Sequence, residues 1–194
     1  MNSTTRSFIP DFIFFLFLAV AGEFIAVGGL KFFSAGFYFS IALLPLMIFL
    51  YRWGLPALPA LVFFGIASAL MMPGSGIGTV AVNGAGYCGL AGGLILLRTA
   101  GRERIRASAY YALLYMFVAW GFMVVLRAVI LSLFEGGILS GLLLVGANES
   151  LSFIASSILF VLMRRRPGLL IYLPALIEES ENEGPPEPWR PEGL

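Results

Sequence analysis

Six apolar stretches, each about long enough to cross a bilayer as a helix, dominate this chain of 194 residues. A helix needs roughly 20 apolar residues to span the hydrocarbon core. Charged residues make up only 12% of the chain, against roughly 25% in a soluble domain, and 59% of the residues are hydrophobic. The sequence therefore predicts an all-α membrane protein, a bundle of six transmembrane helices at residues 9–29, 36–51, 55–72, 79–98, 108–132 and 139–163.

The end of the chain has a different composition from the rest. Residues 1–166 contain all six apolar stretches, whereas six of the eleven acidic residues fall in the last 17 positions. The segment 168–177 is apolar but too short to span, so we expect it to lie along the membrane interface. The Pro- and Glu-rich remainder of residues 167–194 has the composition of a disordered, solvated tail.

Basic residues indicate how the chain is oriented in the membrane, because loops rich in lysine and arginine stay in the cytoplasm. If the N-terminus is inside, the outer loops carry only Lys31. The inner segments then carry Arg6, Arg52, Arg98, Arg102, Arg104, Arg106, Arg164, Arg165 and Arg166. This alternation predicts a multi-pass protein of the inner or plasma membrane with both termini in the cytoplasm.

The first apolar stretch has a second interpretation. Arg6, the apolar run after it and the small residues Ala19 and Ala21 fit a secretory signal, whose cleavage would leave five spans. Asp11 interrupts the head of that run and the apolar stretch resumes beyond Glu23, which favours a retained helix.

Polar residues occur at one depth in several of the predicted helices. With a rise of 1.5 Å per residue, Glu23, Asn148 and Arg127 lie about 21, 22 and 28 Å from the inner face of a core about 30 Å thick. Asn83 and Tyr87, near the outer start of the fourth helix, join the same layer, as does Glu149. Ionisable groups inside a membrane are rare and often functional, so we expect a polar pocket that opens to the outside.

A structural role for the same residues stays open. Arg127 is expected to pair with Glu149 or Glu23, and such a pair can simply hold the helices together. If Arg127 instead faces a ligand, its guanidinium together with Asn148 suits an anionic or amide-bearing heterocycle.

Several classes of chemistry are excluded by residues that the chain lacks. It has no histidine, which excludes HExxH metalloprotease sites, Ser–His pairs and histidine-ligated metals. Its single aspartate, Asp11, excludes a paired-aspartate protease, and the glycines of the 73–78 loop lack the lysine of a phosphate-binding loop. We therefore expect no catalytic activity, no cofactor, no metal and no nucleic-acid partner.

Small residues four positions apart mark faces where another helix can approach closely. Gly22 and Ala26 form such a pair in the first helix, and Gly65 and Ala69 form one in the third. Packing inside the bundle is the favoured role for each pair, and docking of a partner protein is the alternative.

Three parts of the chain resemble the substrate-binding S components of energy-coupling factor (ECF) vitamin transporters. The runs 40–48 (SIALLPLMI) and 51–55 (YRWGL) resemble their second helix, 86–91 (GYCGLA) resembles the fourth, and Asn148 followed by Arg164 to Arg166 is similar to the last span. The resemblance covers about residues 8–170.

This resemblance implies a non-catalytic subunit that captures a vitamin or precursor from outside the cell. It also implies partners: a transmembrane coupling subunit, docked through alanine-type faces such as Gly22 and Ala26, and two cytoplasmic ATPases. The implied ligand-binding residues are Tyr87, Arg127 and Asn148, with Asn83 and Glu149 as weaker candidates. Glu23 is a further candidate from its depth alone. Thiamin-binding members carry an acid directly before the tyrosine, where this chain has Gly86, and this difference disfavours thiamin.

Two other functions remain possible from the residues alone. One is a membrane scaffold or assembly protein of the cell envelope, in which the polar residues fix the bundle and the tail recruits partners. The other is a secondary transporter that acts alone, although the chain shows no internal repeat of the kind such folds often have.

Overall fold

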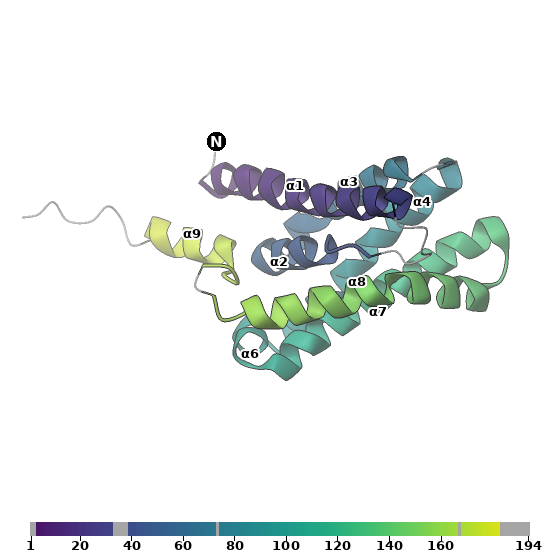
Figure 1. Cartoon of the computed structure of the whole chain (residues 1–194). Helices are drawn as coiled ribbons and strands as arrows, with labels where there is room; N and C mark the ends of the chain where they lie inside the picture. Colours follow the sequence, from purple (N-terminus) through teal and green to yellow (C-terminus); the bar gives the residue numbers. More distant parts are fainter. Residues whose placement is uncertain (1–2, 33–38, 73, 167, 183–194) are drawn as a thin grey trace, which may run out of the picture.

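The computed structural model describes residues 3–32, 39–72, 74–166 and 168–182. Within these residues every regular element is a helix, and Figure 1 shows the longest of them, α1, α7 and α8, running along one long axis. The α-helices are α1 (Ser3–Phe32), α2 (Leu43–Trp53), α3 (Leu58–Met71), α4 (Ile77–Gly86), α5 (Gly93–Thr99), α6 (Arg102–Ala107), α7 (Ala109–Glu135), α8 (Ile138–Met163) and α9 (Leu173–Asn182). Two 3₁₀ helices, η1 (Leu55–Ala57) and η2 (Tyr87–Gly92), precede α3 and join α4 to α5.

Four helical stretches are long and apolar enough to cross a membrane: Thr4–Gly28, Ile77–Thr99, Ala109–Phe134 and Ile138–Met163. They coincide with the first, fourth, fifth and sixth predicted spans, with ends that differ by a few residues. Their outward faces carry large apolar side chains, among them Phe17, Phe24, Leu133, Leu143 and Leu162. Several polar side chains of these helices are buried inside the bundle, among them Glu23, Asn83, Arg127 and Glu149, which is the arrangement a helical bundle needs in lipid.

The second predicted span, residues 36–51, differs from the observed helix. α2 begins only at Leu43 and its 11 residues rise about 17 Å, roughly half of a bilayer core. Every residue of α2 except Arg52 is buried, and the helix lies between α1 and α8 (Figure 1). Because protein rather than lipid surrounds it, α2 does not need the length of a membrane span.

The backbone that leads into α2 is satisfied by side chains. The Ser40 amide donates a hydrogen bond to Ser152 Oγ at 2.9 Å, and the Ala42 amide donates to Ser40 Oγ at 3.2 Å. Non-helical backbone at membrane depth is tolerated where protein encloses it and pairs its polar groups. Part of the predicted span, residues 36–38, lies outside the described residues.

The predicted fourth span is a composite of α4, η2 and α5, and its glycines explain the interruption. Gly86, Gly89 and Gly92 recur every three residues, and in a 3₁₀ helix residues three apart lie one above the other. A methyl group on Gly89 would lie 2.5 Å from Met123 Cα, and methyl groups on Gly86 and Gly92 would overlap side chains of α7. The glycines therefore allow α7 to pack directly on the backbone of η2.

Several chain segments meet at one end of the bundle, which we call the basic end because most of the arginines lie there. Arg52 at the end of α2 pairs with Asp11 of α1 at 2.8 Å and donates to the carbonyls of Gly168 and Leu169. Trp53 Nε1 also donates to Asp11, at 3.0 Å. Figure 1 shows that α6, α9 and the first turns of α1 also lie at this end.

α9 extends the bundle at the basic end. Its first five residues, 173–177, belong to the segment 168–177 that the sequence predicts to lie along the membrane interface. The helix packs against α1 and α2, and the side chains of Leu170 and Ile177 are buried. The last 12 positions of the predicted tail, 183–194, lie outside the described residues. The opposite end, which we call the far end, contains the α3–α4 and α7–α8 connections (Figure 1).

Candidate functional site: a buried polar layer and the pocket beside it

Arg127 of α7 joins three helices. Its guanidinium forms an ion pair with Glu149 of α8 and donates a 2.5 Å hydrogen bond to Asn83 Oδ1 of α4. The three residues are buried, with 8%, 8% and 2% of their surfaces exposed. A charge in such a place is tolerated only with close partners, because burial without them costs several kcal/mol. The structure therefore has the Arg127–Glu149 pair that the sequence analysis considered.

Tyr87 packs against the arginine of this pair. The centre of its ring is 5.2 Å from Arg127 Cζ, a distance typical of a cation–π contact. The ring of Phe64 of α3 packs edge-on against it, with the ring centres 4.8 Å apart. Tyr87 thus connects the ion pair to the helices on the other side of the bundle.

Glu23 occupies the α1 side of the same layer. It is completely buried, and its Oε1 accepts a 2.6 Å hydrogen bond from the Ser68 hydroxyl of α3. Glu23, Glu149 and Arg127 all lie close enough to influence the Tyr87 hydroxyl electrostatically. We call the set Glu23, Ser68, Asn83, Tyr87, Arg127 and Glu149 the polar layer.

Gly86 makes room for Arg127. A Cβ atom at this position would overlap Arg127 Cγ and would lie 3.2 Å from its Cδ. The stem of the arginine therefore lies against bare backbone at the end of α4. This explains in structural terms why the residue before Tyr87 is a glycine here, since any side chain would push the guanidinium away from Asn83.

A pocket of about 290 Å³ opens next to the polar layer at the far end. Asn83, Arg127 and Glu149 form its polar wall, and Leu131, Phe134, Leu144 and Val145 are among its apolar lining. Asn148 lies on the exposed side of α8 and also lines the pocket, and its amide forms no hydrogen bond with another described residue. The pocket thus offers a buried charge pair, amide groups and apolar walls to a small molecule.

The structure brings the predicted site residues together to different degrees. Asn83, Tyr87, Arg127 and Glu149 form one connected cluster, whereas Asn148 stands apart from them at the pocket wall. Glu23 belongs to the same layer but reaches it through Ser68 and Tyr87, and it does not line the pocket.

The small residues considered for partner docking have neighbours inside the bundle. A methyl group on Gly22 would lie 3.3 Å from Ile41 Cγ1, and one on Gly65 would overlap the backbone of Asn83. Ala69 is fully buried and Ala26 is half-buried. The Gly65 and Ala69 face thus lies inside the bundle, and Gly65 serves to bring α3 onto α4 beside the polar layer.

Sequence reasoning missed two residues that fix the layer and the basic end. The role of Ser68 was not predicted, because a serine in an apolar helix is common. Its position three residues after Gly65, on the same face of the helix, was the available signal. For Asp11, the sequence predicted an interruption of the first apolar run but no partner. Its position near the inner end of the first span, level with Arg52, was the available signal for the ion pair.

Comparison with known proteins adds no identification. No protein-family model matches the chain, and no curated protein and no solved structure matches it at a significant level. The resemblance to ECF substrate-binding components is therefore confined to the runs 40–48, 51–55 and 86–91 and to Asn148 with Arg164 to Arg166.

Proposed function

We propose that this protein captures a small polar heterocycle, such as a vitamin or a vitamin precursor, as the substrate-binding subunit of an ECF-type importer. The observation that carries the proposal is the pocket of about 290 Å³ whose wall contains Asn83, Arg127 and Glu149. Its volume is close to the lower limit of roughly 300 Å³ for small-molecule sites, and it combines apolar walls with a few convergent polar groups. Such a pocket suits a ligand of one or two rings.

The direction of capture follows from the distribution of charge. The basic end holds Arg52, Arg98, Arg102 and the arginines after α8, and the pocket is at the far end. With the positively charged loops in the cytoplasm, the pocket faces the outside. In this proposal the chain crosses the membrane six times, α2 and α3 forming the two short crossings, and both termini are cytoplasmic.

The pairing of Arg127 narrows the class of ligand. Because Glu149 neutralises the guanidinium, the pocket carries a charge pair rather than an excess of positive charge. A simple anion is therefore disfavoured. A neutral or zwitterionic heterocycle can donate to the carboxylate of Glu149 and exchange two hydrogen bonds with the amide of Asn148.

Uptake would need partners, since the protein has no nucleotide-binding motif of its own. As the resemblance implies, a transmembrane coupling subunit and two cytoplasmic ATPases would supply the energy. The exposed apolar side of α1, which includes Phe14, Phe17 and Phe24, offers the coupling subunit a surface that the bundle leaves open.

A structural scaffold is the second candidate, and one observation favours it. The buried ionisable groups of the described residues all have internal partners: Arg127 with Glu149, and Glu23 with Ser68. A protein whose polar layer only fixes helix positions would look the same in this respect. It would not need the exposed amide of Asn148 beside a pocket.

A thermal-shift screen tests the proposal. The purified full-length protein is heated in detergent with a panel of vitamins, vitamin precursors and nucleobases, each in large excess. A ligand at 1,000 times its dissociation constant adds about 4 kcal/mol of stability, so one compound or one chemical series should stand clear of the rest. If no compound raises the unfolding midpoint of a sample that unfolds cooperatively, the scaffold is favoured.

A further inference from the structure

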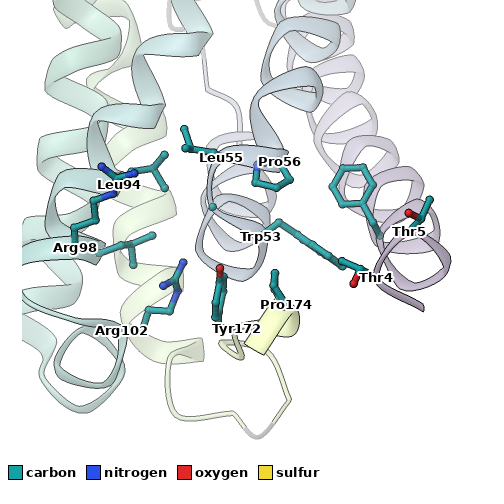
Figure 2. Close-up of a pocket in the computed structure, with 13 residues that line it drawn as sticks. Thr4, Thr5, Trp53, Leu55, Pro56, Leu94, Arg98, Arg102, Tyr172 and Pro174 are labelled. Carbon is teal, nitrogen blue, oxygen red and sulfur yellow. The ribbon is translucent and has the colours of Figure 1, made fainter. Parts of the chain in front are cut away.

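A second pocket, larger than the one beside the polar layer, lies at the basic end. It has a volume of about 530 Å³ and lies between the start of α1, the end of α2, α5 and the segment before α9 (Figure 2). None of the polar-layer residues lines it. It is therefore a separate site.

Two arginines give this pocket a positive charge. Arg98 at the end of α5 and Arg102 at the start of α6 both line it, and no acidic side chain is among its lining residues. Within the described chain neither arginine forms an ion pair with an acid. Glu103, the next residue, is exposed and does not line the pocket.

Arg102 is held in a fixed orientation by its neighbours. Its guanidinium stacks on the ring of Tyr172, with Cζ 3.7 Å from the ring centre, and its Nε donates to the Tyr51 carbonyl at 3.3 Å. The Tyr51 hydroxyl donates in return to the Arg102 carbonyl at 2.8 Å. A guanidinium with a fixed orientation loses little freedom on binding, and its planar fork matches a phosphate group.

The pocket is amphipathic along its depth. Figure 2 shows Leu55 and Pro56 at the side nearer the middle of the bundle, and Tyr172 and Pro174 at the opposite side. Leu94 lies one turn further into the bundle than Arg98 on the same helix, and Leu55 is half-exposed. Thr4 and Thr5 of α1 add hydroxyl groups on the side across from the arginines (Figure 2). Positive charge thus lies toward the end of the bundle and apolar surface toward its middle.

We propose that this pocket binds the headgroup of an anionic phospholipid. The phosphate lies between Arg98 and Arg102, the hydroxyls of Thr4 and Thr5 face the rest of the headgroup, and the acyl chains follow the apolar wall at Leu55 and Leu94. Basic pockets between helices at the membrane interface are suited to this chemistry. A soluble phosphate compound offers the same phosphate group but would leave the apolar wall uncovered.

Native mass spectrometry of the full-length protein tests this assignment with matched charge variants. Arg98→Gln removes a pocket arginine that makes no hydrogen bond within the described residues, and Arg104→Gln removes an exposed arginine of α6 outside the pocket. Both variants lose one positive charge. Each protein is titrated with dioctanoyl phosphatidylglycerol, dioctanoyl phosphatidylcholine and glycerol phosphate.

We expect the wild type and Arg104→Gln to retain one phosphatidylglycerol, and to bind phosphatidylcholine and glycerol phosphate at least tenfold more weakly. Arg98→Gln should weaken phosphatidylglycerol binding about tenfold, because the phosphate loses a direct charged partner. An equal loss in Arg104→Gln would show general charge attraction and overturn the site. Equal binding of glycerol phosphate and phosphatidylglycerol would assign the pocket to a soluble phosphate compound instead and would also overturn the lipid proposal.

Discussion

Each end of the bundle holds an arginine paired with a carboxylate, and the surroundings of the two pairs differ. At the basic end, the Arg52 and Asp11 side chains are 12% and 22% exposed, and Arg52 has backbone carbonyls and Asp11 has Trp53 as further partners. In the polar layer, both Arg127 and Glu149 side chains are only 10% exposed and are enclosed by apolar helices. The Asp11 carboxylate therefore keeps some contact with water, whereas Arg127 and Glu149 depend more fully on their protein partners.

The largest effect should come from removing one partner of the deeper pair. Glu149→Leu leaves Arg127 buried without its counterion, and we expect a loss of about 3–5 kcal/mol in the free energy of unfolding. Reversible unfolding in mixed micelles measures it.

The double variant Arg127→Met/Glu149→Leu is the control for this prediction. Replacing a buried ion pair by apolar residues of similar size is often neutral, so stability should return to near the wild-type value, while ligand binding should be lost. A double variant that binds ligand normally would show that the pair does not serve the pocket.

Gly86→Ala should have the next largest effect, because the new methyl group overlaps the stem of Arg127. We expect a loss of about 3 kcal/mol and weaker ligand binding, since the guanidinium must move away from Asn83. Gly121→Ala in α7 is the control, because a Cβ there meets no atom within 4 Å. Equal stability of the two variants, measured by thermal unfolding, would contradict the close packing of Arg127 on the end of α4.

Ser68→Ala removes a hydrogen bond from the fully buried carboxyl of Glu23. A buried acceptor that loses a partner costs about 2 kcal/mol, and we expect a destabilisation of that size. The matched change Ser132→Ala removes a hydroxyl that donates to the Val129 carbonyl on the exposed side of α7, and it should have almost no effect. Chemical denaturation of the two variants side by side provides the test.

Asp11→Asn should have the smallest effect on stability, because the side-chain oxygen of asparagine can still accept a hydrogen bond from Trp53 Nε1. The change removes only the charge of a partly exposed ion pair, which contributes up to about 1 kcal/mol, and Arg52 keeps the Gly168 and Leu169 carbonyls as acceptors. A loss as large as that of Glu149→Leu would remove the contrast between the two ends.

The grouping of several polar residues could be predicted from the sequence because helix rise is constant. Counting residues along the helices placed six polar residues at one level: Glu23, Asn83, Tyr87, Arg127, Asn148 and Glu149. The structure joins Asn83, Tyr87, Arg127 and Glu149, whereas Glu23 pairs with Ser68 and Asn148 stands apart at the pocket wall. The identity of Arg127's partner could not be chosen between Glu149 and Glu23, since depth gives no information on rotation about a helix axis. That choice depends on how α7 packs on η2.

The structure of α2 was the main feature that apolar composition could not predict. A lipid-facing span and a helix enclosed by other helices are both continuously apolar, so the run around Leu43 to Trp53 fits either. The break into η2 was also missed, although the three-residue spacing of Gly86, Gly89 and Gly92 carries the signal.

The central claim, that the pocket beside the polar layer binds a small heterocycle, is tested most directly by the affinity of Asn148→Ala for the compound found in the screen. Asn148 forms no hydrogen bond with another described residue, so its loss should leave the unfolding midpoint unchanged. We predict at least a tenfold increase in the dissociation constant measured by calorimetry, and no change for Leu143→Ala on the exposed side of α8. An unchanged dissociation constant for Asn148→Ala would place the ligand elsewhere and contradict the account.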